Sequence, residues 1–341
     1  MRKKKRVTLR DVAKQAGVSP TAVSFAYNAP HQLSQATRDR IIDTANELGY
    51  QPHPVARTLA TGRTNTIGLV MPTGLDWILH DPLFSLILGE IGAVCDEVQM
   101  RILIVPAIGE VSPGLLATIA ADGFVLFSIH GSHPLAKAVE HSNRPLVMIN
   151  GDENLRAPMF NVDDFNGAYK AAQHLLEKGH RRIAVGTIGP REDGVVIPAY
   201  ERRMRGYEAA VHDAGLPPST LRPVFIRGLL SMAKESFDKI WLLDPRPTAV
   251  LCVSDVRALS VLNGARKAGI SVPGDLAVVG FDNLPDSAVS TPPLTTLKQD
   301  LSGRIRLALR TLFALIADEG GDDGPPPLHI TPMELEVRES T

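Results

Sequence analysis

The sequence predicts a small all-α head followed by a larger α/β core, whose two lobes each contain a parallel sheet. Three observations predict this division. Apolar residues recur at helical spacing through about the first fifty residues, a proline-containing stretch follows, and from Thr66 short apolar runs alternate with helical patterns. Such alternation indicates parallel sheets covered on both faces, and about 275 residues suit two lobes better than one.

The first predicted helix of the head has one apolar face. Residues recur there at i, i+3, i+4 and i+7, namely Leu9, Val12, Ala13 and Ala16. Thr8, followed three residues later by Asp11, resembles a capping box. Gly17 is expected to end this helix in a tight turn.

Two further helices complete the head. Ser19 is the expected N-cap of the second, with Pro20 in its first position. Its inward side chains are expected to be Val23, Ala26 and Tyr27, and its exposed ones Pro20, Thr21, Ser24 and Phe25. Ser34 is the expected cap of the third, which turns Ile41, Ala45 and Leu48 inward and ends at Gly49. The pattern predicts a helix-turn-helix unit, and a generic three-helix bundle is the alternative.

A hinge and linker is expected over residues 52–64. Pro52 and Pro54 stop the third helix, and Pro54 can begin a short helix over Val55 to Ala60, which is marginal in isolation. The head then covers residues 1–51 and the core residues 65–341. Within the core, we expect an N-terminal lobe from about 65–160 and 292–320, and a C-terminal lobe from about 161–291 and 321–341.

Charge is unevenly distributed along the chain. Residues 1–63 contain 11 Lys and Arg against 4 Asp and Glu, whereas the remainder contains 25 basic and 33 acidic residues. A basic head on an acidic body indicates a polyanionic partner for the head, although a solvated basic tail gives the same count.

Cysteines and apolar runs limit the class of protein further. Cys95 and Cys252 both lie in apolar runs, which predicts buried, reduced thiols in a cytoplasmic protein rather than a disulfide framework or a zinc site. The basic "MRKKKR" is not followed by an apolar segment, so no export signal is expected. No apolar run approaches about 20 residues, so no membrane span is expected.

Polar residues follow several of the predicted core strands. Ligands of open parallel sheets bind beyond the carboxyl ends of the strands, and Thr73, Asn150, Ser254, Asp255 and Asp282 occupy such positions. Arg203 begins a helix that can reach the same place. Hydroxyl, amide and carboxylate groups together suit a neutral polyol, sugar or nucleoside. Helix capping is the alternative role for Ser254 and Asp255.

Enzyme motifs are absent. The sequence has no G-x-G-x-x-G after a strand, no Walker loop, no G-x-S-x-G elbow and no H-E-x-x-H. No catalytic residue, metal site or cofactor is therefore expected. His31, His53 and His133 lie in turn-like segments, where surface roles are favoured over catalysis. Trp77 either stacks on a ligand or anchors its own loop. One core helix pattern is clear, a stripe of Phe84, Leu88, Ile91, Cys95 and Val98.

Several motifs resemble those of the lactose-repressor (LacI/GalR) family of bacterial transcription regulators. In chain order they are "VTLRDVAKQAGVSPTAVS", "LSQATRDRI", "ANELGYQPHPVARTLATGRTNTIGLVMP", "EKGHRRIA", "RRMRGYEAA", "VVGFDN", "TPPLTTLKQD" and "MELEVREST". The resemblance covers essentially the whole chain. It implies a helix-turn-helix head, a hinge helix and a two-lobed core of the periplasmic-binding-protein-like type I fold. It also implies a homodimer that binds a near-palindromic double-stranded DNA operator and a small-molecule effector.

The resemblance implies specific DNA contacts. Base-reading positions fall on Pro20, Thr21 and Phe25, and Phe25 stands where many members have arginine or another hydrogen-bonding residue. An apolar contact to a thymine methyl suits Phe25 better than a guanine edge. Groups that position the DNA backbone are Thr8, Ser19, Ser24, Asn28, Ser34 and Thr37. In the hinge, Leu59 matches the leucine that wedges into the minor groove, and Ala56 matches the small residue beside it.

Effector contacts are implied in the same way. They map to Asn150, Arg203, Ser254 and Asp282, with Val162 and Asp163 nearby, and Ser254 stands where asparagine is common. Two loops beside this site, "PTGLDWILHDP" and "GTIGPREDGVVIPAYE", are unusual for the family, so the effector cannot be copied from a relative. No heptad helix follows "VREST", which favours a dimer over a tetramer.

The sequence therefore predicts a DNA-binding transcription regulator, specifically a repressor controlled by a sugar or related polar metabolite. A sugar-binding protein without a DNA role is one alternative, which the basic head and the absent signal sequence oppose. An α/β enzyme with a DNA-binding head is another, which the absence of nucleophile and cofactor motifs opposes.

Overall fold

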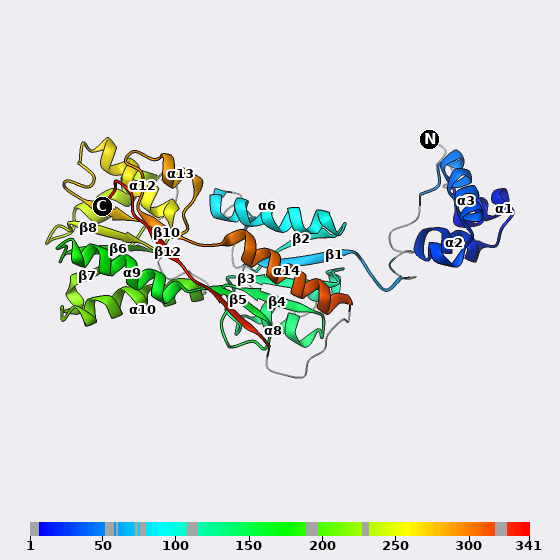
Figure 1. Ribbon diagram of the computed structural model, residues 1–341, viewed down its shortest axis with the longest axis horizontal. Coiled ribbons are helices and arrows are strands. Elements are labelled where there is room, and N and C mark those ends of the chain that lie inside the picture. The colour runs from blue at the N-terminus through cyan, green and yellow to red at the C-terminus, as the bar shows by residue number, and fades with distance from the viewer. Residues whose placement is uncertain are drawn as a thin grey trace. The chain divides into compact units, whose positions relative to one another are not determined.

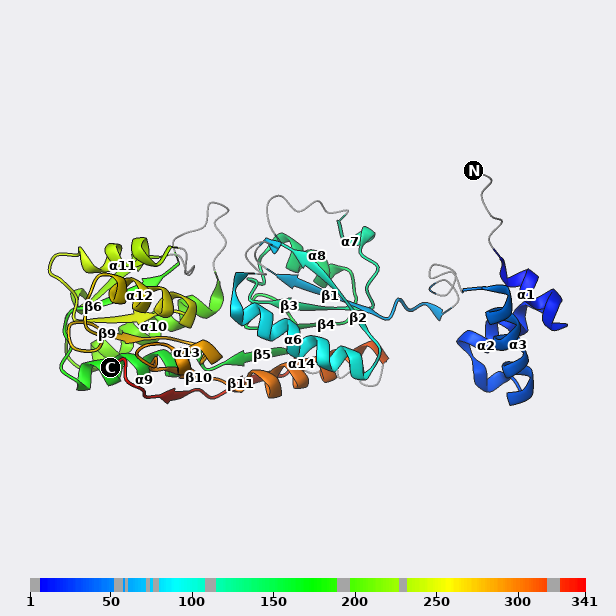
Figure 2. The same ribbon diagram turned by 90° about the horizontal axis from the view of Figure 1, so that it is seen from above.

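The chain divides into two compact units, a head unit of Met1–Asn65 and a core unit of Thr66–Thr341. Figure 1 labels their helices and strands, and Figure 2 shows the same elements from above. The computed structural model describes residues 7–51, 58, 61–71, 74–75, 80–107, 115–188, 197–226, 232–317 and 326–341. The expected sites at Thr73, Trp77, His53, Ala56 and Leu59 lie outside these ranges.

The head unit has the predicted helical order. Its described elements are α1 (Leu9–Ala16), α2 (Pro20–Asn28), the 3-10 helix η1 (Pro30–Gln32) and α3 (Gln35–Leu48). Gly17 and Gly49 adopt left-handed backbone conformations at the ends of α1 and α3, where a side chain would be strained. Fully buried Val12, Val23 and Ile41 hold the three helices together. The helix-turn-helix prediction is confirmed.

One expectation for the head needs correction. Ser24 and Phe25, expected to be exposed, are half-buried. Tyr27 and Leu48 pack against the core from its edge, as expected, and Tyr27 also packs edge-on against Tyr50 with ring centroids 6.2 Å apart. The head is so small that residues beside its core are shielded on one side by a neighbouring helix.

The first lobe of the core unit is built on a six-stranded parallel sheet in the order β11-β5-β4-β3-β1-β2. The strands are β1 (Thr66–Met71), β2 (Arg101–Pro106), β3 (Gly123–Phe127), β4 (Leu146–Ile149), β5 (Met159–Val162) and β11 (Leu328–Thr331). Helices α6 (Pro82–Glu97) and α14 (Leu301–Ala317) pack on one face, and α7 (Leu115–Thr118) and α8 (Pro134–His141) on the other. Both faces are therefore buried, as a parallel sheet requires.

The stripe expected on α6 is correct except at its end. Phe84, Leu88, Ile91 and Cys95 are buried or half-buried against the sheet, whereas Val98 is 50% exposed. Val98 is the C-cap residue, and its backbone has already left the helical conformation that would carry it onto the stripe.

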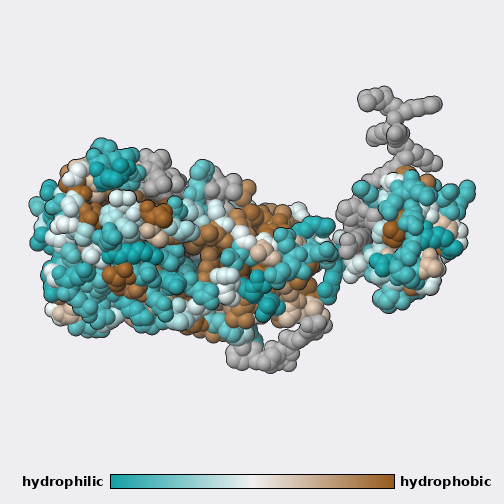
Figure 3. Space-filling view, turned by 45° about the horizontal axis from the view of Figure 1, so that its top comes forward, coloured by the Kyte–Doolittle hydropathy of each residue, from teal (hydrophilic) through white to brown (hydrophobic). Residues whose placement is uncertain are grey.

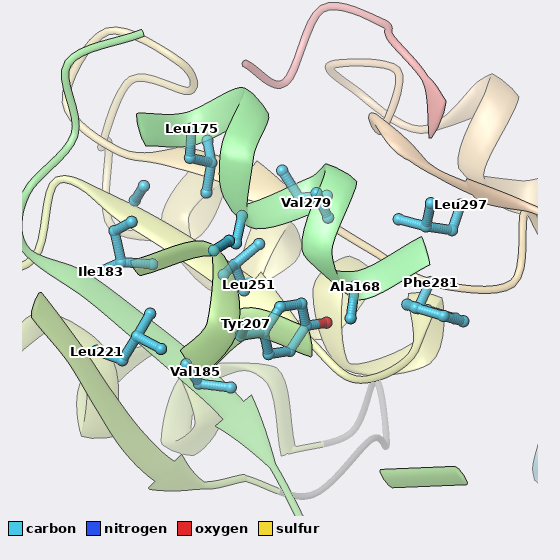
Figure 4. Packing of buried hydrophobic residues seen from close by; sticks show 14 of the residues in the cluster. Ala168, Leu175, Ile183, Val185, Tyr207, Leu221, Leu251, Val279, Phe281 and Leu297 are labelled. Atoms are coloured by element: carbon cyan, nitrogen blue, oxygen red, sulfur yellow. The ribbon is translucent and has the colours of Figure 1, made fainter. Parts of the chain in front are cut away.

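The second lobe is built on a four-stranded parallel sheet in the order β7-β6-β8-β9. Its strands are β6 (Ile183–Thr187), β7 (Leu221–Phe225), β8 (Ala249–Cys252) and β9 (Ala277–Val279). One face carries α9 (Asp164–Glu177) and α10 (Pro198–Asp213), whose side chains interdigitate with the sheet in Figure 4. The other carries α11 (Ala233–Trp241) and α12 (Asp255–Lys267). Short elements η2 (Pro218–Thr220) and α13 (Pro285–Val289) complete this lobe.

The lobe boundaries differ from those expected. Strand β11 lay within the segment 321–341 that was assigned to the C-terminal lobe, but it pairs in parallel with β5 at the edge of the first sheet. Strand β5 also continues through Val162, beyond the expected limit at residue 160. After β11 the chain returns to the second lobe, where β12 (Glu334–Glu336) pairs antiparallel with β10 (Thr296–Lys298). Strand β10 was expected in the N-terminal lobe, but Leu297 packs in the core of the second. The pairing of β11 with β5 depends on contacts between segments far apart in the sequence, so the local pattern of residues does not predict it.

No helix within the described residues is both long enough and apolar enough to cross a bilayer. On the face shown in Figure 3, hydrophilic residues dominate both units and hydrophobic residues form separate patches.

Candidate functional site

The first candidate site is the surface of the head around the beginning of α2. The N–H of Ala22 donates to the Ser19 hydroxyl at 3.1 Å, so Ser19 caps α2 as expected. Ser19, Pro20 and Thr21 are exposed. The beginning of a helix presents free N–H groups and a positive dipole end, which attract phosphate. Small side chains at this point allow close approach of a large anionic surface.

The other predicted DNA-contacting residues of the head are linked by short-range hydrogen bonds. The Asn28 side-chain amide donates to the Ser24 hydroxyl at 3.3 Å, while its own carbonyl oxygen is buried and has no partner among the described residues. Ser34 caps α3 by accepting the N–H of Thr37 at 3.3 Å. Both the N–H and the hydroxyl of Thr8 donate to the carboxylate of Asp11. The exposed members of this group are Thr8 and Ser34, and the half-buried ones are Ser24, Asn28 and Thr37.

The second candidate site is a buried polar network where the two lobes meet. We call it the interlobe cluster, and its members are Asn150, Asp164, Arg202, Arg203, Asp282, Gln299 and Arg304. Three of the predicted effector-site residues belong to it, namely Asn150, Arg203 and Asp282. Sequence reasoning missed the other four. Arg203 was expected to begin its helix, but it lies in the second turn of α10.

Arg203 is the centre of the cluster. Its Nε–H donates to Asp164 at 2.8 Å, and its other nitrogen lies 3.6 Å from the Asp282 carboxylate. The guanidinium also lies 3.5 Å from the ring centroid of Phe281. Burial alone would lower the pKa of Arg203, but the charges of Asp164 and Asp282 raise it above the ordinary value. Arg203 therefore remains a cation in a site that excludes water.

Gly206, in the motif "RRMRGYEAA", is what allows Arg203 to reach Asp164. A Cβ atom at this position would lie 2.3 Å from the backbone oxygen of Phe165. Only glycine permits α10 to approach α9 so closely. The adjacent Arg202 then donates to the same Asp164 carboxylate at 2.9 Å and to the backbone oxygen of Gly151, which follows β4 of the first lobe, at 3.0 Å.

Asp164, rather than its predicted neighbour Asp163, is the carboxylate that joins the interlobe cluster. Asp164 is fully buried between two arginines, whereas Asp163 is half-buried and caps α9 by accepting the N–H of Asn166 at 3.1 Å. Val162, the third residue of this group, is buried in the apolar core of the second lobe. Both carboxylates follow the same strand, so the sequence alone offered no means of choosing between them.

Asp282 connects Arg203 to the first lobe. Its backbone φ is 119°, a conformation that residues with a side chain rarely adopt, so the local structure holds the carboxylate in place under strain. Burial raises the pKa of Asp282 well above its ordinary value, while Arg203 opposes that rise. The Gln299 amide donates to Asp282 at 3.3 Å, and its oxygen accepts from Arg304 at 2.6 Å. Arg304 also donates to the side-chain oxygen of Asn150.

Ser254 and Asp255 sit at the beginning of α12 but have different roles. Ser254 is the N-cap residue, yet its hydroxyl makes no capping bond and instead accepts from Arg257 at 2.9 Å. Asp255 is fully buried, and it accepts from the hydroxyls of Ser287 and Thr296 at 2.6 and 2.5 Å. Asp255 thus fixes the segment after "VVGFDN" in place, and Arg257 is a further buried cation that the sequence reading missed.

The remaining sequence candidates have ordinary structural roles. His133 caps α8 by accepting the N–H of Leu135, and His31 is exposed. Cys95 and Cys252 are free and buried, and burial raises the pKa of both thiols, that of Cys95 to about 11. Neither thiol is a nucleophile at neutral pH.

Comparison with known proteins decides the family. Residues 8–53 match the model of the lacI family of bacterial regulatory proteins, and residues 172–341 match a periplasmic binding protein-like domain. The chain is 32% identical to the transcriptional repressor CytR of Escherichia coli K12, over 98% of this chain and 96% of CytR. It is 34% identical to the transcriptional regulator DegA of Bacillus subtilis, over 87% of each. The chain belongs to the lacI family.

Solved structures of lacI-family proteins agree with the fold. A complex of the regulator CelR with cellobiose is 28% identical and has a TM-score of 0.69, covering 98% of this chain and 100% of CelR. A lac repressor bound to ONPG is 26% identical with a TM-score of 0.78, covering 99% of this chain and 100% of the repressor. The lacI-family chain described here is thus a helix-turn-helix transcription regulator with a periplasmic-binding-protein-like core, not an enzyme.

Proposed function

We propose that the protein is a cytoplasmic repressor that binds a near-palindromic operator as a homodimer, and that a small effector at the interlobe cluster controls this binding. The observation that carries the proposal is the head, where a serine-capped α2 exposes Pro20 and Thr21 at its beginning. That geometry suits a recognition helix in the major groove, with Phe25 beside the base edges. The named relatives CytR of Escherichia coli and PurR of Aliivibrio fischeri are transcriptional repressors.

Control by an effector follows from the connection between the lobes. The hydrogen bond from Arg202 to Gly151 runs between the two lobes. Gln299, in the segment between β10 and α14, joins Asp282 of the second lobe to Arg304 of the first. A ligand that inserts its own polar groups among them favours one arrangement of the lobes over another. The coupling to DNA binding is no larger than that preference.

A gel-shift titration tests the DNA-binding function. Full-length protein is titrated against DNA from upstream of its own and neighbouring genes, and against unrelated DNA of the same length. We expect at least about 1000-fold tighter binding to one upstream fragment, and an affinity that falls steeply with salt because cations of the head displace counterions. Equal affinity for all fragments would reject a sequence-specific regulator.

A further inference from the structure

Two buried arginines of the core unit have no carboxylate partner among the described residues. Arg257 is 2% exposed in the first turn of α12, and Arg304 is 4% exposed in the first turn of α14. Ion pairs in the described part of the core involve Arg202 and Arg203 but neither of these two. Their hydrogen-bond acceptors are neutral, namely the Ser254 hydroxyl for Arg257 and the amide oxygens of Asn150 and Gln299 for Arg304.

Each of these guanidinium groups also has an unused donor. The Nε atoms of Arg257 and Arg304 are buried and have no hydrogen-bond partner within the part of the chain that the structure describes. Buried cations are stable when an anion pairs with them, and a helix N-terminus is an unfavourable place for a positive charge. Both arginines therefore lower the stability of the ligand-free protein. This is expected where a ligand supplies the missing contacts.

Nearby carboxylates do not meet this need. Asp164, Asp282 and Asp255 are held by the partners described above. Asp81 is the N-cap of α6 in the first lobe, and its carboxylate accepts the N–H of Leu83 at 2.9 Å. It makes no ion pair with Arg257. Burial raises the pKa of Asp81, and the positive charge of Arg257 opposes that rise.

We propose that the effector carries an acidic group, a carboxylate or a phosphate ester, which binds Arg257, and that Arg304 contributes a second cation from the other lobe. The inference rests on the proposed function, because it defines the chemistry of the effector. A planar guanidinium binds either acid through two parallel hydrogen bonds. Helix α12 belongs to the second lobe and α14 to the first, so an acidic ligand attracts both lobes. Arg203, Asp282 and Asn150 then contact its neutral polar groups.

Thermal unfolding of the full chain in phosphate tests the inference. Inorganic phosphate is titrated against chloride at equal ionic strength. We expect phosphate alone to raise the Tm of the wild type in a saturable way, and Arg257→Met to abolish the rise. Without phosphate, Arg257→Met should itself raise the Tm by about 2–4 °C, because an apolar side chain replaces an unpaired buried cation. If Arg257 has only a structural role, Arg257→Met should instead lower the Tm.

The matched control is Arg266→Met, because Arg266 is exposed in the last turn of the same helix. It should keep the full response to phosphate. Arg304→Met provides a second variant and should weaken the response. The inference is overturned if phosphate and chloride act equally on the wild type, or if phosphate stabilises Arg257→Met as much as the wild type.

A matched set of sugars then distinguishes the two acids. Calorimetry with glucose, gluconate and glucose 6-phosphate compares a neutral, a carboxylate and a phosphate form of one scaffold. We expect one acidic form to bind at least about tenfold more tightly than glucose, and Arg257→Met to remove the difference. Tighter binding of glucose would overturn the inference. None of these measurements uses DNA. Failure of the gel shift therefore rejects the regulator function alone, and absence of a phosphate response in the wild type rejects the acidic effector alone.

Discussion

The head and the interlobe cluster hold their functional side chains in opposite ways. Hydrogen bonds in the head join residues three or four positions apart, such as Ser24 with Asn28, and many of these groups face solvent. In the interlobe cluster they join residues as far apart as Asn150 and Arg304, 154 positions, and nearly all the groups are buried. A substitution in the head should therefore change recognition with little loss of stability, whereas one in the cluster should change both.

The largest expected effect is that of Asp164→Ala in the cluster. Removing this carboxylate leaves Arg202 and Arg203 without their shared partner in a buried site, and we expect a loss of about 3–5 kcal/mol in the free energy of unfolding. Urea denaturation followed by circular dichroism measures it. The control Asp163→Ala removes an adjacent carboxylate that only caps α9, and it should cost about 1 kcal/mol. Equal losses at the two positions would show that the ion pairs contribute little.

A smaller effect is expected for Phe25→Ala in the head. If Phe25 contacts a thymine methyl, the variant should lose about 1–3 kcal/mol of discrimination at one base position in each half-site. Gel shifts against operators with single base changes measure this, and circular dichroism checks that the head is folded. The same loss on operator and random DNA would make Phe25 a packing residue, a role for which its half-buried position is also suited.

The smallest expected effect is on the stability of the core at acidic pH. Burial, together with the nearby Lys178, lowers the pKa of His174 and of His180 below the ordinary value. The unfolded chain therefore takes up protons first as the pH falls below about 6.5, so the stability that these groups contribute is present above that pH and is lost below it. His180→Gln should flatten the acid side of the stability curve of the core. His31→Gln, at an exposed position in the head, should leave it unchanged.

The difference in sequence separation between interacting residues of the head and of the interlobe cluster also explains what the sequence could predict. Caps at Ser19 and Ser34 and the turns at Gly17 and Gly49 depend on neighbours within one or two helical turns, and their positions were correct. Asp282, predicted from a strand end, and Arg203, predicted from the helix in "RRMRGYEAA", do lie together.

Long-range partners were beyond the sequence patterns. Arg304 lies in a helix whose apolar pattern predicts only packing, and nothing local shows that it reaches Asn150. Asp164 could not be told from Asp163, because the choice depends on how closely α10 approaches α9. Strand β11 was assigned to the wrong lobe for the same reason, since its pairing with β5 joins segments more than 160 residues apart.

That pairing has a consequence for synthesis. Residues 328–336, in the red segment of Figure 1, supply both the edge strand β11 of the first sheet and the strand β12 that pairs with β10. A nascent chain on the ribosome leaves both lobes incomplete until these residues have emerged, with the edge of β5 open to other chains. The head, whose core is completed within its first fifty residues, has no such delay. During translation the head can fold long before the core that is proposed to control it.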